Sequence, residues 1–297
     1  PPPTHPAAHP PPLAYGSAGS EATGGAGNQA DLKTFQELGA YGVGTLTCIV
    51  SFDPKNDWGH RFVPVDPQVI ADQFEAATVT HEPSVVKIGM LGTPATIDVV
   101  AESLRSRTWE HVVLDPVLIC KGQEPGAALD TDTALRAQVL PLATVVTPNL
   151  FETRTLAGVE SIETVEELVE AARKVQALGP RAGVAKGGVA RPGPGAVDVL
   201  VDGDEVHVLR TPKIGEERVS GAGCTFAAAI TAELAKGASV LDAARVAKDV
   251  VTASIEDRVA SDAPFDAVRV GARRGPPAAS PGGGLASGAP PSARATS

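Results

Sequence analysis

The sequence predicts an α/β fold with a mainly parallel central sheet and helices on both of its faces. Short apolar, β-branched runs alternate along the chain with segments whose apolar residues recur at helical spacing. Several of these helical segments begin with a proline or with a threonine or aspartate cap. Parallel strands joined by helices require right-handed crossovers, which cover both faces of the sheet with helices.

The expected elements follow one another in order. The apolar runs predict strands at 44–50, 85–89, 112–114, 144–146 and 183–186. The helical periods between and after them predict helices at 67–77, 94–107, 133–140 and 164–178. Two further runs at 197–201 and 206–209 flank Asp202-Gly203-Asp204, which is typical of a β-hairpin. Two helices, at 224–236 and 240–259, complete the series.

Composition separates the ends of the chain from its body. The 297 residues include 31 Gly and 26 Pro, and the prolines are concentrated in residues 1–12 and again in 275–297. Neither end carries enough apolar surface to offset the entropy lost on ordering. The sequence therefore predicts a disordered Pro-rich arm at 1–12, one globular domain at 13–274 and a disordered Gly/Pro/Ala-rich tail at 275–297.

Several protein classes are not supported. No run approaches the roughly 20 apolar residues of a membrane-spanning helix, and no cationic segment precedes an apolar one near residue 1, so we expect a cytoplasmic protein without a membrane partner. The three cysteines are widely spaced and form no CxxC pair, which argues against disulfides or structural zinc. A net charge of −10 without a basic cluster argues against nucleic acid.

The sharpest motif is SGAGCT at 220–225, directly before an apolar helix. Glycines let backbone N–H groups turn inward, and the helix N-terminus adds partial positive charge, so the motif can cradle an anion. It lacks the P-loop lysine. Cys224 starts the helix, where the dipole lowers a thiol pKa and suits the residue to act as base or nucleophile. The alternatives are a helix entry made for close packing and a small buried cysteine.

Two weaker signals lie in other loops. The cluster GGAG at 24–27 either approaches a ligand or simply connects a strand to a helix. Asn149 and Glu152 share one helical face after the strand 144–146, where the carboxylate could hold Mg²⁺ through water or could cap the helix. Asp115 is a second carboxylate in the same kind of loop. Ligands of open parallel sheets bind at such loops, beyond the carboxyl ends of the strands.

These motifs together resemble the vitamin-kinase branch of the ribokinase-like superfamily. In order they are GGAGNQADLKTF at 24–35, KIGML at 87–91, LDPV at 114–117, TPNLFE at 147–152, KGG at 186–188 and GAGCT at 221–225. The branch contains hydroxymethylpyrimidine (phosphate) kinases and a similar group of bacterial pyridoxal kinases, and the resemblance covers about residues 14–260. It implies a three-layer ribokinase-like kinase domain, ATP and Mg²⁺ as cofactors, a small-molecule substrate and a homodimer.

Three features are more similar to the pyridoxal kinases. Phe52 stands where the pyrimidine kinases usually carry a glutamine, and an apolar ring cannot pair with the aminopyrimidine. The continuation DPKNDWGH at 53–60 resembles the pyridoxal kinase group. ICKGQE at 119–124 resembles the mobile lid of the dual-cysteine pyridoxal kinases, whose lid thiol adds to the substrate aldehyde.

The resemblance also implies residue roles. Cys224 would take the proton of the substrate hydroxyl, while the N–H groups of Gly221, Ala222 and Gly223 would hold the γ-phosphoryl. Asp115 and Glu152 would order Mg²⁺. The nucleotide would lie beside Asn149, Lys186, Gly187, Gly188 and Val240. The substrate would be lined by Gly19, Glu21, Phe52, Met90 and Val117 and covered by Cys120.

The chain departs from the family pattern at three places. Glu21 replaces a usual aspartate, Val219-Ser220 replaces a frequent Thr-His, and the first strand, at 13–17, lacks the usual aliphatic run. On the six motifs and the three features similar to the pyridoxal kinases, we expect a pyridoxal kinase acting on the 5′-hydroxymethyl group. The alternatives are a hydroxymethylpyrimidine (phosphate) kinase or a bifunctional enzyme on the same machinery, and a ligand-binding relative with weak catalysis.

Overall fold

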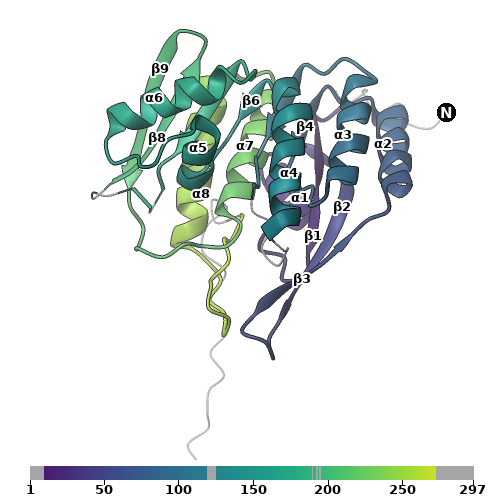
Figure 1. Ribbon diagram of the computed structural model, residues 1–297, viewed down its shortest axis with the longest axis horizontal. Helices are drawn as coiled ribbons and strands as arrows, with labels where there is room; N and C mark the ends of the chain where they lie inside the picture. Colours follow the sequence, from purple (N-terminus) through teal and green to yellow (C-terminus); the bar gives the residue numbers. More distant parts are fainter. Residues whose placement is uncertain (1–9, 119–124, 189, 192, 194, 272–297) are drawn as a thin grey trace, which may run out of the picture.

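One mixed β-sheet organises the chain. The computed structural model describes residues 10–118, 125–188, 190, 191, 193 and 195–271, and within them the strand order is β3-β2-β1-β4-β5-β6-β7-β8-β9 (Figure 1). The strands are β1 (Leu13–Glu21), β2 (Tyr41–Asp53), β3 (Gly59–Pro64), β4 (Val85–Ile88), β5 (His111–Leu114), β6 (Val145–Val146), β7 (Ala182–Lys186), β8 (Gly195–Asp202) and β9 (Glu205–Pro212). The six adjacent strands β2, β1, β4, β5, β6 and β7 are parallel, whereas β3, β8 and β9 each run antiparallel to a neighbour. The predicted mainly parallel sheet is confirmed.

Helices cover both faces of this sheet (Figure 1). They are α1 (Gly27–Glu37), α2 (Pro67–His81), α3 (Pro94–Arg105), α4 (Pro125–Gln138), α5 (Leu150–Ala157), α6 (Val165–Gln176), α7 (Ala222–Ala235) and α8 (Val240–Glu256), with a 3₁₀ turn at Leu140–Leu142. Helix α7 packs between α1 and α8 on one face, and α2 to α6 lie on the other.

The strands are apolar on both sides because both faces are covered. Neighbouring residues of β4 illustrate this: Val85 belongs to the core beneath α7 and α8, while Val86 packs with Phe74 of α2 and Ile97 of α3. Continuous apolar runs of this kind are what predicted buried parallel strands from the sequence.

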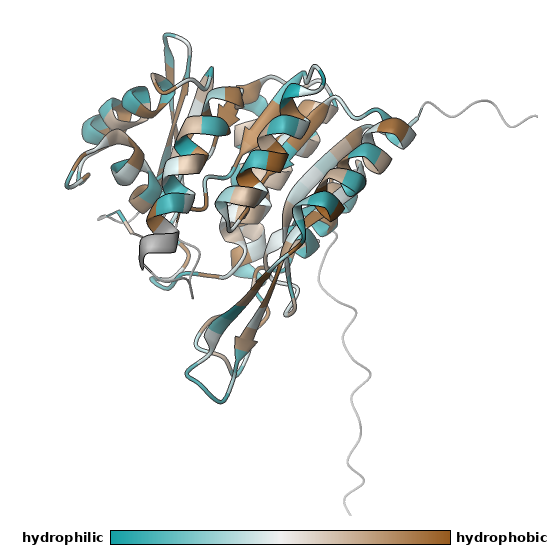
Figure 2. Cartoon of the chain, turned by 45° about the vertical axis from the view of Figure 1, so that its right-hand side comes forward, coloured by the Kyte–Doolittle hydropathy of each residue, from teal (hydrophilic) through white to brown (hydrophobic). Residues whose placement is uncertain are grey.

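The structure adds three elements to the predicted set, α1, β3 and α5, and starts α4 at Pro125 where the pattern predicts residue 133. Helix α1 has no apolar stripe because Asn28, Asp31 and Thr34 are among its buried residues. No residue of strand β3 is buried, so the strand lacks the apolar face by which it could be predicted. Figure 2 shows the β2–β3 hairpin extending away from the helices.

The weak first strand is nevertheless central. Residues 14–19 of β1 are all buried, and Gly16 leaves room for Asp31 and Phe35 of α1 to approach the backbone. Small residues therefore serve close packing of a helix on this strand. Cys48 is buried in β2.

Some predictions fall beyond these residues. Residues 1–9 and 272–297, and Cys120, lie outside the described residues, so the predicted arm, tail and lid cysteine stay predictions. No helix in the part of the chain that the structure describes is long and apolar enough to cross a membrane.

Candidate functional site

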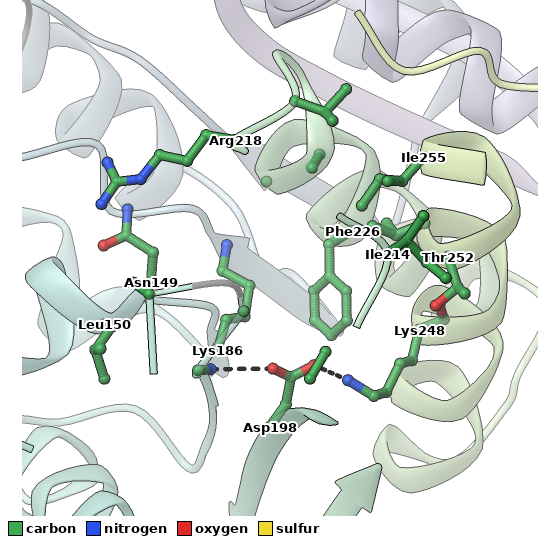
Figure 3. Close-up of a pocket in the computed structure, with 18 of the residues that line it drawn as sticks. Asn149, Leu150, Lys186, Asp198, Ile214, Arg218, Phe226, Lys248, Thr252 and Ile255 are labelled. Atoms are coloured by element: carbon green, nitrogen blue, oxygen red, sulfur yellow. Dashed lines mark hydrogen bonds and ion pairs between the residues drawn. The ribbon is translucent and has the colours of Figure 1, made fainter. Parts of the chain in front are cut away.

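A pocket of about 400 Å³ opens at the carboxyl edge of the parallel strands (Figure 3). Its walls come from the loops after β5, β6 and β7, from the start of α7 and from the last turns of α8. The structure brings together here eleven residues to which the sequence assigns roles: Asp115, Val117, Asn149, Glu152, Lys186, Gly187, Gly188, Gly221, Ala222, Gly223 and Cys224.

The glycine motif forms the start of α7. Gly221 is the N-cap of this helix and has a φ of 83°, a left-handed conformation that favours glycine. A Cβ at Gly221 would overlap the carbonyl oxygen of Gly25, so the two Gly-rich loops meet backbone to backbone. The chain near residue 267 braces both loops: Ser220 N donates to Asp266 O at 2.8 Å, and Val268 N donates to Ser220 O at 3.0 Å. The first turn of α7 therefore sits on a fixed support.

Cys224 occupies the first turn of α7 and is partly exposed. Burial raises the pKa of its thiol to about 11, and the carboxylates of Asp115 and Asp31 act in the same direction, whereas the Lys87 ammonium lowers it. The expectation of a lowered pKa is therefore wrong, because burial disfavours the charged thiolate more than the Lys87 ammonium favours it. The thiol is protonated at neutral pH, and its thiolate is a strong base once formed.

A buried ion pair supports this end of the sheet from below. Lys87 Nζ of β4 donates to both carboxylate oxygens of Asp31 of α1 at 2.7 and 2.8 Å, and neither side chain is exposed. Burial alone would lower the pKa of Lys87, but the negative charge of Asp31 raises it. Lys87 is therefore a permanent cation close enough to Cys224 to lower the pKa of its thiol.

Asp115 and Lys186 face each other across the pocket floor. Lys186 Nζ lies 3.3 Å from Asp115 Oδ1, and a Cβ built on Gly223 would lie 3.5 Å from the same Nζ. The ammonium of Lys186 also lies 5.7 Å from the centre of the Phe226 ring. This cation therefore stands directly in front of the glycine motif, where an anionic group would be held.

Asn149 and Glu152 form a reciprocal cap at the start of α5. Glu152 N donates to Asn149 Oδ1 at 3.0 Å, and Asn149 N donates to Glu152 Oε2 at 2.7 Å. Burial raises the pKa of Glu152 to about 8, and the nearby Asp115 carboxylate adds to this effect. The helix-capping role is confirmed, and Glu152 also lines the pocket.

Sequence reasoning missed a second buried ion pair in the pocket wall. Lys248 Nζ of α8 lies 2.7 Å from Asp198 Oδ2 of β8, and Asp198 Oδ1 accepts from Gly187 N at 3.1 Å (Figure 3). The signal was available as one acidic residue inside the apolar run 197–201 and one lysine on the buried face of a helix. The pair fixes the loop after β7 against α8.

Five predicted residues do not line this pocket. Val240 is a correction: it is buried among apolar residues at the start of α8, whereas the last turns of that helix face the pocket. Gly19 and Met90 lie together near Cys48, because a Cβ on Gly19 would come within 2.6 Å of Cys48 Sγ and 3.9 Å of Met90 Sδ.

Glu21 and Phe52 lie near the ends of β1 and β2. The Glu21 carboxylate accepts hydrogen bonds from Thr23 N at 2.6 Å and from Gly25 N at 3.2 Å, so it holds its own loop. Phe52 packs against His60 and Phe265, with ring centres 4.7 and 4.8 Å away. Each therefore shapes the loop region after β1 and β2.

Comparison with known proteins identifies the family. A family model described as phosphomethylpyrimidine kinase matches residues 21–269. The chain belongs to this family. The resemblance inferred from the six ordered motifs is thereby confirmed.

The chain is similar in sequence to kinases of both kinds that the resemblance names. The chain is 45% identical to the pyridoxine kinase of Bacillus subtilis over 240 residues, covering 81% of this chain and 89% of that protein. It is 39% identical to a hydroxymethylpyrimidine/phosphomethylpyrimidine kinase of Streptomyces coelicolor over 245 residues, covering 82% and 89%.

Solved structures agree in fold. An ADP complex of Bacillus subtilis pyridoxal kinase superposes with a TM-score of 0.84 at 43% identity, over 88% of this chain and 98% of that chain. Staphylococcus aureus pyridoxal kinase with AMP-PCP and pyridoxal gives 0.81 at 37% identity, over 88% and 94%. The chain thus has the α/β architecture of pyridoxal kinase structures.

Proposed function

We propose that this chain is an ATP-dependent pyridoxal kinase that phosphorylates the 5′-hydroxymethyl group of pyridoxal. One observation carries the proposal: the glycine motif with Cys224, the cation Lys186 and the cap residue Asn149 all line one pocket at the carboxyl edge of the sheet. The relatives at 45% and 43% identity are a pyridoxine kinase and a pyridoxal kinase, which favours this substrate class.

The residues divide the transfer between them. The bond between the γ-phosphorus and the β–γ bridging oxygen of ATP breaks, and ADP leaves. A bond from the γ-phosphorus to the substrate hydroxyl oxygen forms, and the hydroxyl proton goes to the Cys224 thiolate. N–H groups of Gly221, Ala222 and Gly223 stabilise the charge on the phosphoryl oxygens in flight. The transition state of phosphoryl transfer is loose, so the substrate hydroxyl keeps its proton until the bond to phosphorus is forming. A strongly basic thiolate is suited to accept the proton at that stage.

The carboxylates of the pocket fit Mg²⁺. Asp115 and Glu152 lie close enough for Asp115 to raise the pKa of Glu152, and a bound cation would relieve this repulsion. The described residues contain no group of three or more His, Cys, Asp and Glu side chains placed to bind a metal. Two carboxylates are enough here, because Mg²⁺ bound with a nucleotide takes its other ligands from phosphates and water. When bound, Mg²⁺ would neutralise phosphate charge.

The proposal includes the finer features of the family. We infer a three-layer ribokinase-like fold, supported by the helices on both faces of the sheet. We also infer a cytoplasmic homodimer acting on small molecules without nucleic acid or membrane partners, supported by the family resemblance and the net charge of −10. The same proposal includes the remaining roles implied by the resemblance. The substrate would be lined by Gly19, Glu21, Phe52, Met90 and Val117 and covered by Cys120.

A second candidate is hydroxymethylpyrimidine (phosphate) kinase activity, which the family model and the Streptomyces coelicolor relative favour. Phe52 argues for pyridoxal because it cannot pair with an aminopyrimidine. Steady-state turnover of pyridoxal and hydroxymethylpyrimidine with ATP, measured side by side, tests the assignment. We expect a higher kcat/KM for pyridoxal. Preference for the pyrimidine would refute it, and phosphorylation of neither would support a ligand-binding relative.

A further inference from the structure

The charges that line the pocket are almost all paired within the protein. Lys186 lies 3.3 Å from Asp115, Lys248 lies 2.7 Å from Asp198, and Lys213 lies 3.7 Å from Glu216. The charge of each of these cations is therefore partly neutralised by a carboxylate of the protein itself. A nucleoside triphosphate that enters this pocket needs further positive charge to offset its phosphates, because these paired cations are already partly neutralised.

Arg218 is the exception among the lining cations. It is exposed, lines the pocket, and makes no ion pair or side-chain hydrogen bond with any residue in the described part of the chain. Figure 3 shows its side chain extending across the pocket toward Asn149 on the opposite wall. Its guanidinium therefore has its full hydrogen-bonding capacity available to a ligand.

The position of Arg218 in the chain ties it to the glycine motif. It precedes Gly221 by three residues. Between them, Ser220 is anchored by its hydrogen bonds with Asp266 and Val268. The backbone on which Arg218 stands is thus held close to the N–H groups of α7, and its flexible side chain can reach from this base over the pocket.

We propose that Arg218 is a catalytic residue that binds the γ-phosphoryl group from the open side of the pocket, opposite Lys186. A planar guanidinium pairs with two phosphoryl oxygens at once, which a lysine cannot do. This inference rests on the proposed kinase function. It assigns Arg218 to the charge that develops on the transferred group, in addition to the backbone N–H groups and Lys186.

The test compares nucleotides with and without a γ-phosphate. In Arg218→Gln, we expect the affinity for AMP-PCP, measured by calorimetry, to fall by roughly tenfold or more, and the affinity for ADP to change by less than about twofold. The kcat should fall by roughly 10- to 100-fold. Compared with Arg218→Gln, Arg218→Lys should recover part of the affinity for AMP-PCP but little of the kcat, since it keeps the positive charge and loses the paired N–H donors of the guanidinium.

Arg210→Gln is the matched control, because Arg210 is an exposed arginine of β9 outside the pocket lining. It should leave binding and rate unchanged. An Arg218→Gln variant that matches wild type for AMP-PCP and for kcat overturns the proposal, and so does an equal loss of ADP and AMP-PCP affinity. If the wild-type chain transfers no phosphate, the kinase assignment fails, while the comparison of the two nucleotides still tests Arg218 by itself.

Discussion

The Lys248→Met substitution removes the cation from the buried pair in the pocket wall. Lys248 and Asp198 are 8% and 7% exposed, so the remaining carboxylate would be left desolvated with Gly187 N as its one hydrogen-bond donor among the described residues. Breaking a buried pair from one side costs about 3–5 kcal/mol. We expect the free energy of unfolding in urea to fall by about that amount, and the KM for ATP to rise because the loop after β7 loses its tether.

A double variant separates this cost from simple loss of packing. Asp198→Asn combined with Lys248→Met removes both charges and keeps an amide oxygen for Gly187 N. Replacing both charges of a buried pair by uncharged groups often changes stability little. The free energy of unfolding of the double variant should therefore be higher than that of the single variant by about 2 kcal/mol or more. The reasoning is refuted if Lys248→Met costs less than about 1 kcal/mol, or if the double variant is no more stable than the single.

Two further predictions concern the chemistry. Cys224→Ala should lower kcat by on the order of 10² or more, and the wild-type kcat should rise between pH 7 and 9 because the pKa of about 11 leaves the thiol protonated below it; a variant as fast as wild type contradicts the role of base. For Glu152, a pKa of about 8 means that the carboxyl is neutral below that pH and competes less well for a cation. The Mg²⁺ concentration for half-maximal rate should therefore fall as pH rises from 6.5 to 8.5, and Glu152→Gln should flatten this dependence; an identical slope in the variant would exclude Glu152 as the titrating group.

Most of the fold could be predicted because buried parallel strands carry apolar runs that no polar face interrupts. Helix α1 could not, since its buried face holds Asp31, whose partner Lys87 is 56 residues away. A polar helix face that is satisfied by a distant ion pair has the same local pattern as an exposed one.

The candidate site divides in the same way. The glycine motif and the cap at Asn149 are local, so their residues alone indicate two helix starts, and the glycines of the first indicate a cradle for an anion. The pair of Asp198 with Lys248 and the environment of Cys224 depend on tertiary contacts, and the thiol pKa moved opposite to the local expectation for that reason. Local sequence thus predicts which groups are present, while their protonation requires the folded surroundings.

The bracing of both Gly-rich loops by the chain near residue 267 bears on the order of events during synthesis. Ala267 packs against Gly25, and its neighbours hydrogen-bond to Ser220. The loop after the first strand and the loop before α7 are therefore locked together by a segment that emerges from the ribosome after all nine strands of the described sheet. A nascent chain can fold its core before this point, but it acquires a rigid catalytic edge only when that segment arrives.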